Sequence, residues 1–129
     1  MNWDLEQLEP LISNQEDLVV TKESDCLLIA NSDGLDAWLA ISGEQILVES
    51  ILFAKSEVSD TESLNDLILK THMLFPLTTV GISEINGEAY YTAFGSLSAQ
   101  SKESSILIEV DTLFQNVAAF LDAYQDYIK

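Results

Sequence analysis

Arginine is absent from this sequence, and only five lysines stand against 22 acidic residues. The net charge of −17 leaves no basic patch of the kind that binds DNA, RNA or anionic lipid, so these are excluded as direct partners. Strong like charge keeps a chain soluble, and solubility alone accounts for such a composition. If the charge serves binding instead, we expect a basic protein partner.

Cysteine and histidine occur once each, as Cys26 and His72. A single cysteine cannot form an intrachain disulfide, which fits a reducing compartment. The opening Met-Asn-Trp-Asp-Leu-Glu carries no basic or apolar leader, so we expect a cytoplasmic protein. The uncharged stretch from Thr71 to Ser83 contains Pro76 and is far shorter than the roughly 20 apolar residues that cross a bilayer, so we expect no direct membrane insertion.

The sequence contains no recognisable motif for metal binding, phosphate binding or catalysis. Metal sites gather histidine, cysteine and carboxylates at set spacings that do not occur here, and the glycines form no phosphate-binding loop, so neither a metal nor a cofactor is expected. Cys26 lies in an apolar run, where burial raises the pKa of a thiol and makes it a poor nucleophile. His72 falls at the end of a predicted helix, where it suits the helix C-terminus. The sequence does not exclude a Cys26–His72 pair, and its 22 carboxylates are interpreted as a solvated surface, so we predict that the protein is not an enzyme.

The sequence does contain the material for a core. Hydrophobic residues make up 47% of the 129 residues, which predicts a single acidic domain over residues 1–129. Four β-rich runs separated by short turns favour an antiparallel meander; they cover residues 18–21, 26–30, 37–41 and 46–53. Asn86-Gly87 is a strong hairpin signal between two further strands, residues 78–85 and 88–94. Tyr90 and Tyr91 are neighbours in the last strand, so they must point to opposite faces.

Three segments show helical spacing. The first covers residues 3–13 and is kept short or kinked by Pro10, and the second follows Ser59-Asp60-Thr61-Glu62, which fits a capping box. The third covers about residues 106–128, with Ser101 or Ser104 as its expected N-cap. The predicted order is α-β-β-β-(β)-α-β-β-α, an α+β fold with one antiparallel sheet and helices packed on it.

The last helix has an apolar stripe too large to stay uncovered on a monomer. It must lie across the sheet or across a second copy of the chain, and we therefore predict a homodimer. Four residues of the stripe are the candidate partner-binding residues: Val110, Phe114, Val117 and Leu121.

Short motifs from residue 45 onward carry a resemblance to a known family. They are Gln45-Ile46-Leu47, Leu74-Phe75-Pro76-Leu77-Thr78-Thr79, Phe94-Gly95-Ser96-Leu97-Ser98, and Ile108-Glu109-Val110 followed by Leu113 and Asn116. Over about residues 40–129 the chain resembles the YjfI-like family of bacterial proteins of unknown function. Departures from the family pattern are mild: Phe75 replaces methionine, Thr78-Thr79 replaces two serines, and Ser96 replaces alanine.

The resemblance has two implications. Genes of this family often lie beside a gene for a PspA-like protein, a coiled-coil membrane-stress protein, which is therefore a candidate partner. The element order is also similar to that of type III secretion chaperones, small acidic dimers that bind segments of other proteins. No accepted catalytic residue of the family exists to carry over.

Two functions remain in competition. The leading hypothesis is a non-enzymatic, cytoplasmic, chaperone-like adaptor that binds a basic or PspA-like protein through an apolar groove with an acidic rim. The alternative is a small-molecule sensor or enzyme of unknown type, with its site near residues 74–79 and 94–98. Pro76 and Gly95 in those motifs otherwise serve only to set turn geometry.

Overall fold

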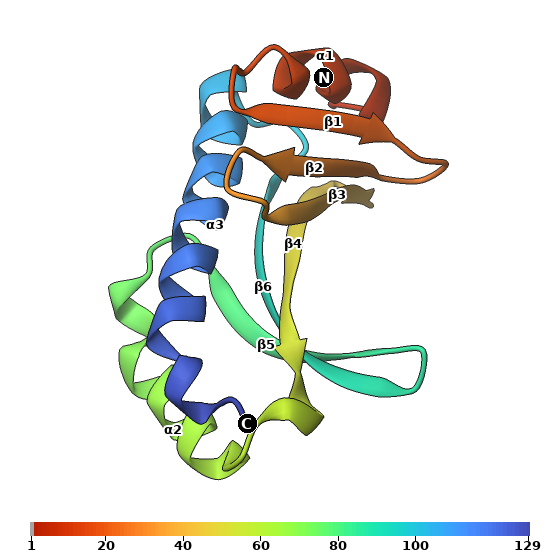
Figure 1. Ribbon diagram of the computed structural model, residues 1–129. Coiled ribbons are helices and arrows are strands. Elements are labelled where there is room, and N and C mark those ends of the chain that lie inside the picture. Colours follow the sequence, from red (N-terminus) through yellow and green to blue (C-terminus); the bar gives the residue numbers. More distant parts are fainter. Residues whose placement is uncertain (1) are drawn as a thin grey trace.

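The computed structural model describes residues 2–129, which form an α+β fold (Figure 1). Six antiparallel strands make one sheet in the order β1-β2-β3-β4-β6-β5. The elements are α1 (Leu5–Ser13), β1 (Leu18–Lys22), β2 (Leu27–Asn31), β3 (Asp36–Ser42), β4 (Gln45–Ala54), η1 (Lys55–Glu57), α2 (Thr61–Thr71), η2 (His72–Leu74), β5 (Thr79–Ile85), β6 (Glu88–Ser98), α3 (Glu103–Ala123) and η3 (Gln125–Tyr127). The predicted fold class is confirmed.

The sheet follows from short connections. Strands β1 to β4 are joined by turns and pair with their chain neighbours, as the meander predicts. The long connection through α2 then brings the β5–β6 hairpin back so that β6, and not β5, pairs with β4. Strand β6 runs on to Ser98 rather than ending at Phe94, because its second half is paired with β4 down to Gln45. A register shift between Ile51 and Phe53 keeps Phe53 on the buried side.

The hairpin signal and the tyrosine pair are both confirmed. Asn86 and Gly87 have positive φ values of 52° and 82°, the conformation that the two-residue turn requires. Tyr91 is buried in the core, and its hydroxyl donates to the Asn65 side chain on α2 at 2.5 Å. Tyr90 points to the opposite face, where its hydroxyl donates to Glu88.

Two expected helix caps are wrong. Asp60, not Ser59, caps α2 by accepting from the Ser63 backbone N–H at 3.1 Å, because the Ser59 hydroxyl donates to the Tyr127 carbonyl instead. Helix α3 begins after Lys102 without a side-chain cap, so neither Ser101 nor Ser104 performs that role. Helix α1 is short, as Pro10 suggests, with nine residues. It continues past the proline to Ser13.

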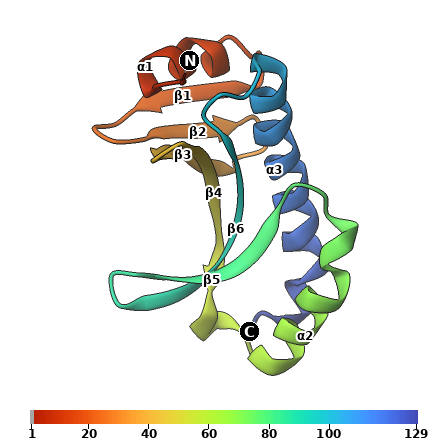
Figure 2. The same cartoon turned by 180° about the vertical axis from the view of Figure 1, so that it is seen from behind.

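All three α-helices lie on one side of the sheet, with α3 along its length (Figures 1 and 2). The α3 stripe and the inward residues of the central strands β4 and β6 share one core. Burying a large aliphatic or aromatic side chain in this way contributes about 1.5–3 kcal/mol. Helix α3 is the one helix among the described residues that is long and apolar enough to cross a membrane, but it serves as the core helix of this fold. Its stripe therefore covers the chain's own sheet.

Candidate functional site

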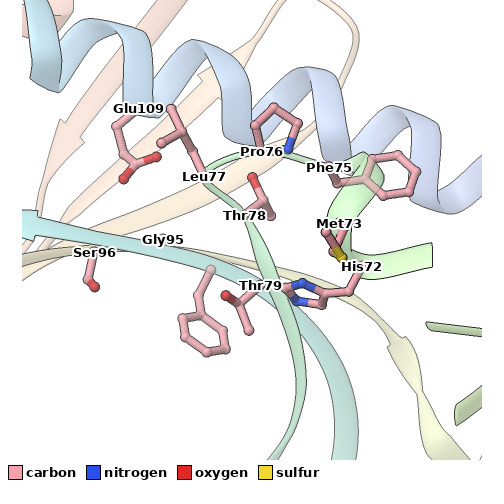
Figure 3. A pocket seen from close by; sticks show the side chains of 11 residues that line it. His72, Met73, Phe75, Pro76, Leu77, Thr78, Thr79, Gly95, Ser96 and Glu109 are labelled. Carbon is pink, nitrogen blue, oxygen red and sulfur yellow. The ribbon is translucent and has the colours of Figure 1, made fainter. Parts of the chain in front are cut away.

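The two motifs at residues 74–79 and 94–98 meet in the structure. Together with one side chain from α3 they form a cleft of about 490 Å³ between the α2–β5 connection, β6 and α3 (Figure 3). We call it the α3 cleft. The lining residues are His72, Met73, Phe75, Pro76, Leu77, Thr78, Thr79, Phe94, Gly95, Ser96 and Glu109. The alternative site of the sequence analysis is thus a real concavity, and it lies where that analysis expected a site.

The wall formed by the α2–β5 connection is held in an unusual conformation. Leu77 has a φ of 68°, in the left-handed region that a side-chain-bearing residue rarely adopts. Asn116 on α3 clamps the backbone on both sides of it: the Asn116 Nδ2 donates to the Pro76 carbonyl at 3.0 Å and to the Thr78 Oγ1 at 2.8 Å. Such strain persists only where surrounding contacts over-determine it, so Asn116 fixes the shape of the cleft.

Glu109 is the unusual charge of the cleft. Its side chain is buried, with 5% of the residue exposed, and its Oε2 has no hydrogen-bond partner among the described residues. Burial raises the pKa of this carboxyl, because the ionised form loses its hydration. Figure 3 shows Glu109 beside Leu77 at one end of the cleft, with His72 and Met73 at the other.

Gly95 makes the approach of Glu109 to the sheet possible. A Cβ at this position would lie 2.9 Å from the Leu77 carbonyl oxygen and 3.1 Å from both the Cδ and the Oε2 of Glu109. Any larger residue would push against the connection and the carboxyl at once. The glycine therefore has a packing reason at this point, beyond the turn geometry that the sequence suggested.

Exposed apolar side chains also occur on α2, the α2–β5 connection and β5, and we call this group the α2–β5 patch; two of its members, Met73 and Leu77, line the cleft as well. Its members are Leu69, Met73, Leu74, Leu77 and Ile82. Met73 is 96% exposed, which is unusual for a side chain of this kind. Between α2 and β5 a groove of about 280 Å³ runs past Leu69 and Ile82. Strand β5 is also an edge strand, paired only with β6 in the part of the chain described.

The four predicted partner-binding residues lie elsewhere. Val110, Phe114 and Val117 are buried in the chain's own core, and Leu121 is half-buried against it. As long as α3 stays on the sheet these side chains cannot face a partner, because they already cover β4 and β6. The α2–β5 patch, by contrast, consists of exposed side chains.

The remaining predicted positions are accounted for. His72 follows the last residue of α2, as predicted, and lines the cleft. The expected place of Cys26 inside a buried strand is wrong, because Cys26 precedes β2 and is only half-buried. Burial first, and then the charges of Glu23 and Asp25, raise the pKa of its thiol. No hydrogen bond joins Cys26 to His72 in residues 2–129, and no cluster of three potential metal ligands occurs in that range.

The sequence analysis did not assign Glu109 or Asn116 to a site, although both occur in its motifs. A signal was present, because Glu109 lies three residues after Ile106 and Asn116 three residues after Leu113, within the stripe of α3. Polar residues at such positions face the core, where they need partners. The 22 acidic residues masked this one, since most of them are solvated.

Comparison with known proteins places the chain among bacterial proteins. The model of a family described as "uncharacterized protein conserved in bacteria (DUF2170)" matches residues 2–128. The uncharacterized protein YjfI of Escherichia coli strain K12 is 29% identical over 115 residues, which cover 88% of this chain and 86% of YjfI. The predicted resemblance to a YjfI-like family is confirmed.

Solved structures share the fold at low sequence identity. YbjN of E. coli, named as a candidate transcription regulator, matches with a TM-score of 0.77 and 14% identity over 98% of this chain and 95% of its own. A chain of the HopA1–SchA chaperone–effector complex has a TM-score of 0.64 at 15% identity, over 89% and 90% of the two chains. A chain of the ExsC–ExsE complex has a TM-score of 0.62 at 13% identity, over 93% and 96%. The predicted likeness to secretion-chaperone folds is therefore confirmed for the fold.

Proposed function

Because this chain belongs to the DUF2170 family, whose members are uncharacterized bacterial proteins, its relatives assign it no activity, and we propose that it is a non-enzymatic protein-interaction module of the chaperone-like adaptor type. The proposal rests on one observation above all, the α2–β5 patch. Five exposed apolar side chains beside an edge strand are a costly surface to leave in water, and such surfaces mark binding sites for other proteins.

The fold likeness supports the same reading. Two of the similar structures are complexes with another protein, one of them named as a chaperone with its effector. The scaffold thus occurs in proteins that hold a partner chain, although fold alone does not transfer a partner. The net charge of −17 favours a basic partner surface, and a PspA-like protein is the candidate that the family resemblance suggests.

A comparison of variants tests the patch. Replacing Met73 and Leu74 together by serine removes two exposed apolar side chains without touching the core, and Ile108→Ser removes an equally apolar exposed side chain on α3 outside the patch. Affinity capture from a lysate of the source organism, followed by titration of the captured protein, should show at least tenfold weaker binding for the double variant. Ile108→Ser should bind like the wild type. Equal binding by all three proteins contradicts the assignment of the patch.

Charge should steer this association and apolar contacts should hold it. Raising the salt concentration from about 0.1 M to about 0.5 M shortens the Debye length below roughly 10 Å, so the association rate should fall moderately. A PspA-like protein from the same organism is the first purified partner to try. If no protein is retained specifically at either salt concentration, the interaction proposal fails as a whole.

We also propose that the protein is a cytoplasmic homodimer. The α3 stripe no longer supports a dimer, because the chain's own sheet covers it. The support now comes from the sheet face opposite the helices, where the half-exposed Leu28 and Trp38 are opposite each other on β2 and β3, and the half-exposed Leu47 on β4 is opposite Ala40. A second copy packing on this face would remove them from water.

A small-molecule sensor or enzyme is the second candidate, and the observation that favours it is the α3 cleft itself. A cleft within the size range of ligand sites, holding a buried carboxyl without a partner, is a recognised mark of a binding site.

A further inference from the structure

Glu109 is the only buried acidic side chain in residues 2–129, out of 22 acidic residues in the sequence. The other carboxylates are at least partly hydrated, and hydration is sufficient to explain them. A carboxylate in the protein interior is stable only when it is paired or hydrogen-bonded. Glu109 takes part in neither of the two ion pairs found in the described residues, which join Lys22 to Glu6 and Lys70 to Asp66.

Two specific residues, Gly95 and Asn116, shape the space around the Glu109 carboxyl. Gly95 leaves free the space that a side chain would take from the carboxyl, and Asn116 holds the connection at Leu77 in a strained conformation that forms the facing wall. The positive φ of Leu77 costs stability, and the close approach of the Glu109 carboxyl to Gly95 leaves a charged group out of water. Costs of this kind are typical of sites that are pre-organised for a ligand.

The walls of the α3 cleft restrict the ligand. Phe75, Pro76 and Phe94 supply apolar and aromatic surface, and the carboxyl lies at one end. An anion is excluded by that carboxyl and by the absence of arginine. Calcium takes six to eight oxygen ligands, and Glu109 is the one acidic residue among the residues that line this cleft. An organic cation fits both the carboxylate and the apolar walls. Its charged group can pair with the Glu109 carboxylate, and its alkyl chain can pack on the apolar walls. The aromatic rings can also attract the charged group through cation–π contacts.

We propose that the α3 cleft binds an alkylammonium or guanidinium group, with Glu109 as its counter-ion. The proposal rests on the proposed function in one respect: a lysine or arginine side chain of the protein partner is the source that the neighbouring α2–β5 patch suggests. A free amine presents the same chemistry, and the experiment below separates the two sources.

The site is tested by nuclear magnetic resonance titration of the full chain. The probes are n-butylammonium, n-butylguanidinium, the neutral n-butanol and a short acetylated peptide containing one lysine. The cations should shift the amide signals around Phe75–Thr79 and Gly95, with roughly millimolar affinity for so small a probe. Butanol should bind at least tenfold more weakly. Shifts spread over the acidic surface, or none at the cleft, overturn the proposal.

Two variants isolate the carboxyl. Glu109→Gln keeps the shape and removes the charge, and should weaken butylammonium binding at least tenfold. Glu103→Gln makes the same change at an exposed position of α3 and should bind like the wild type, which controls for the general attraction of cations to a chain of charge −17. Equal affinity for the cations in both variants contradicts the role of Glu109.

A direct readout in the wild-type protein does not depend on any variant. The carboxyl carbon of Glu109 should titrate at a lower pH when butylammonium is present, because a bound cation favours the ionised form. Cation affinity should accordingly rise as the pH rises. His72 is the one other titratable group that lines the cleft, so Glu109→Gln, which keeps His72, should lose this dependence. An affinity for butylammonium that stays level or falls with rising pH would refute the role of Glu109 as its counter-ion.

Two further comparisons distinguish a partner side chain from a free amine as the source of the cation, and the cation site from the adaptor function. Tighter binding of the lysine peptide than of butylammonium assigns the cation to a protein partner, and the reverse order assigns it to a free amine. If cations bind at Glu109 but the Met73 and Leu74 variants retain the captured protein, the interaction surface is wrong and the cation site stands. If the captured protein depends on the patch but no cation binds, the cation site is wrong and the adaptor function stands.

Discussion

The buried carboxyl of Glu109 should make this protein less stable as the pH rises, and Glu109→Gln should remove that effect. Burial raises the pKa of Glu109 above the ordinary value of 4.5 in the folded chain. The folded state therefore holds this proton more tightly than the unfolded state does. The stabilisation from the protonated group is complete below the unfolded pKa and is lost as the pH rises through the folded pKa.

The expected size follows from the burial and the missing partner. A buried polar group without a hydrogen-bond partner costs about 1–3 kcal/mol, and more when it is charged. Glutamine at position 109 carries an amide cost of its own, but that cost does not change with pH. The free energy of unfolding of Glu109→Gln minus that of the wild type should therefore grow by about 1–3 kcal/mol between about pH 5 and about pH 8.

Urea titrations at several pH values measure this difference. The series should start no lower than about pH 5, because the isoelectric point is near 4.1 and a chain without net charge tends to precipitate. Glu103→Gln is the matched control, since it removes one exposed charge from the same helix and should follow the wild-type profile. Profiles of wild type and Glu109→Gln that stay parallel within about 0.5 kcal/mol would refute the argument that Glu109 is desolvated.

Three further predictions concern the cleft and the dimer. Gly95→Ala should lower the free energy of unfolding by about 1–3 kcal/mol in urea titrations, because its Cβ would press on the Leu77 carbonyl, and no loss would show that the connection yields. Asn116→Ala should cost about 2–3 kcal/mol through its two hydrogen bonds to the connection, against about 0.5 kcal/mol or less for the exposed Gln115→Ala, and equal losses would contradict the clamp. Light scattering on a sizing column should give the mass of two chains for the wild type and of one for Trp38→Ser, and a wild-type monomer at high micromolar concentration excludes the homodimer.

The local elements of this protein were predictable because their signals are local. The primed turn needs positive φ at two adjacent residues, and Asn86-Gly87 supplies them whatever the rest of the chain does. Alternation places Tyr90 and Tyr91 on opposite faces of a strand in the same way. The capping of α2 was less predictable, because Ser59 and Asp60 are both good acceptors and a contact with the distant Tyr127 decides between them.

The apolar periodicity of α3 does not predict what the helix packs against. Its apolar stripe must be buried, but the spacing of the residues does not determine whether it packs on the chain's own sheet or on a second copy of the chain. The structure chooses the sheet, and so Val110, Phe114 and Val117 become core residues. Met73 and Leu74, by contrast, are typical core residues by type, but the structure leaves both of them exposed.

The sequence by itself determined the acidic charge, the α+β element order, the hairpin and the family motifs, because composition, periodicity and turn chemistry are properties of neighbouring residues. Only the tertiary structure decided that residues 74–79 and 94–98 meet at Glu109, and that Asn116 clamps the wall between them. Among 22 acidic residues, the one that is buried is selected by long-range packing of α3 on β6, which no local pattern encodes.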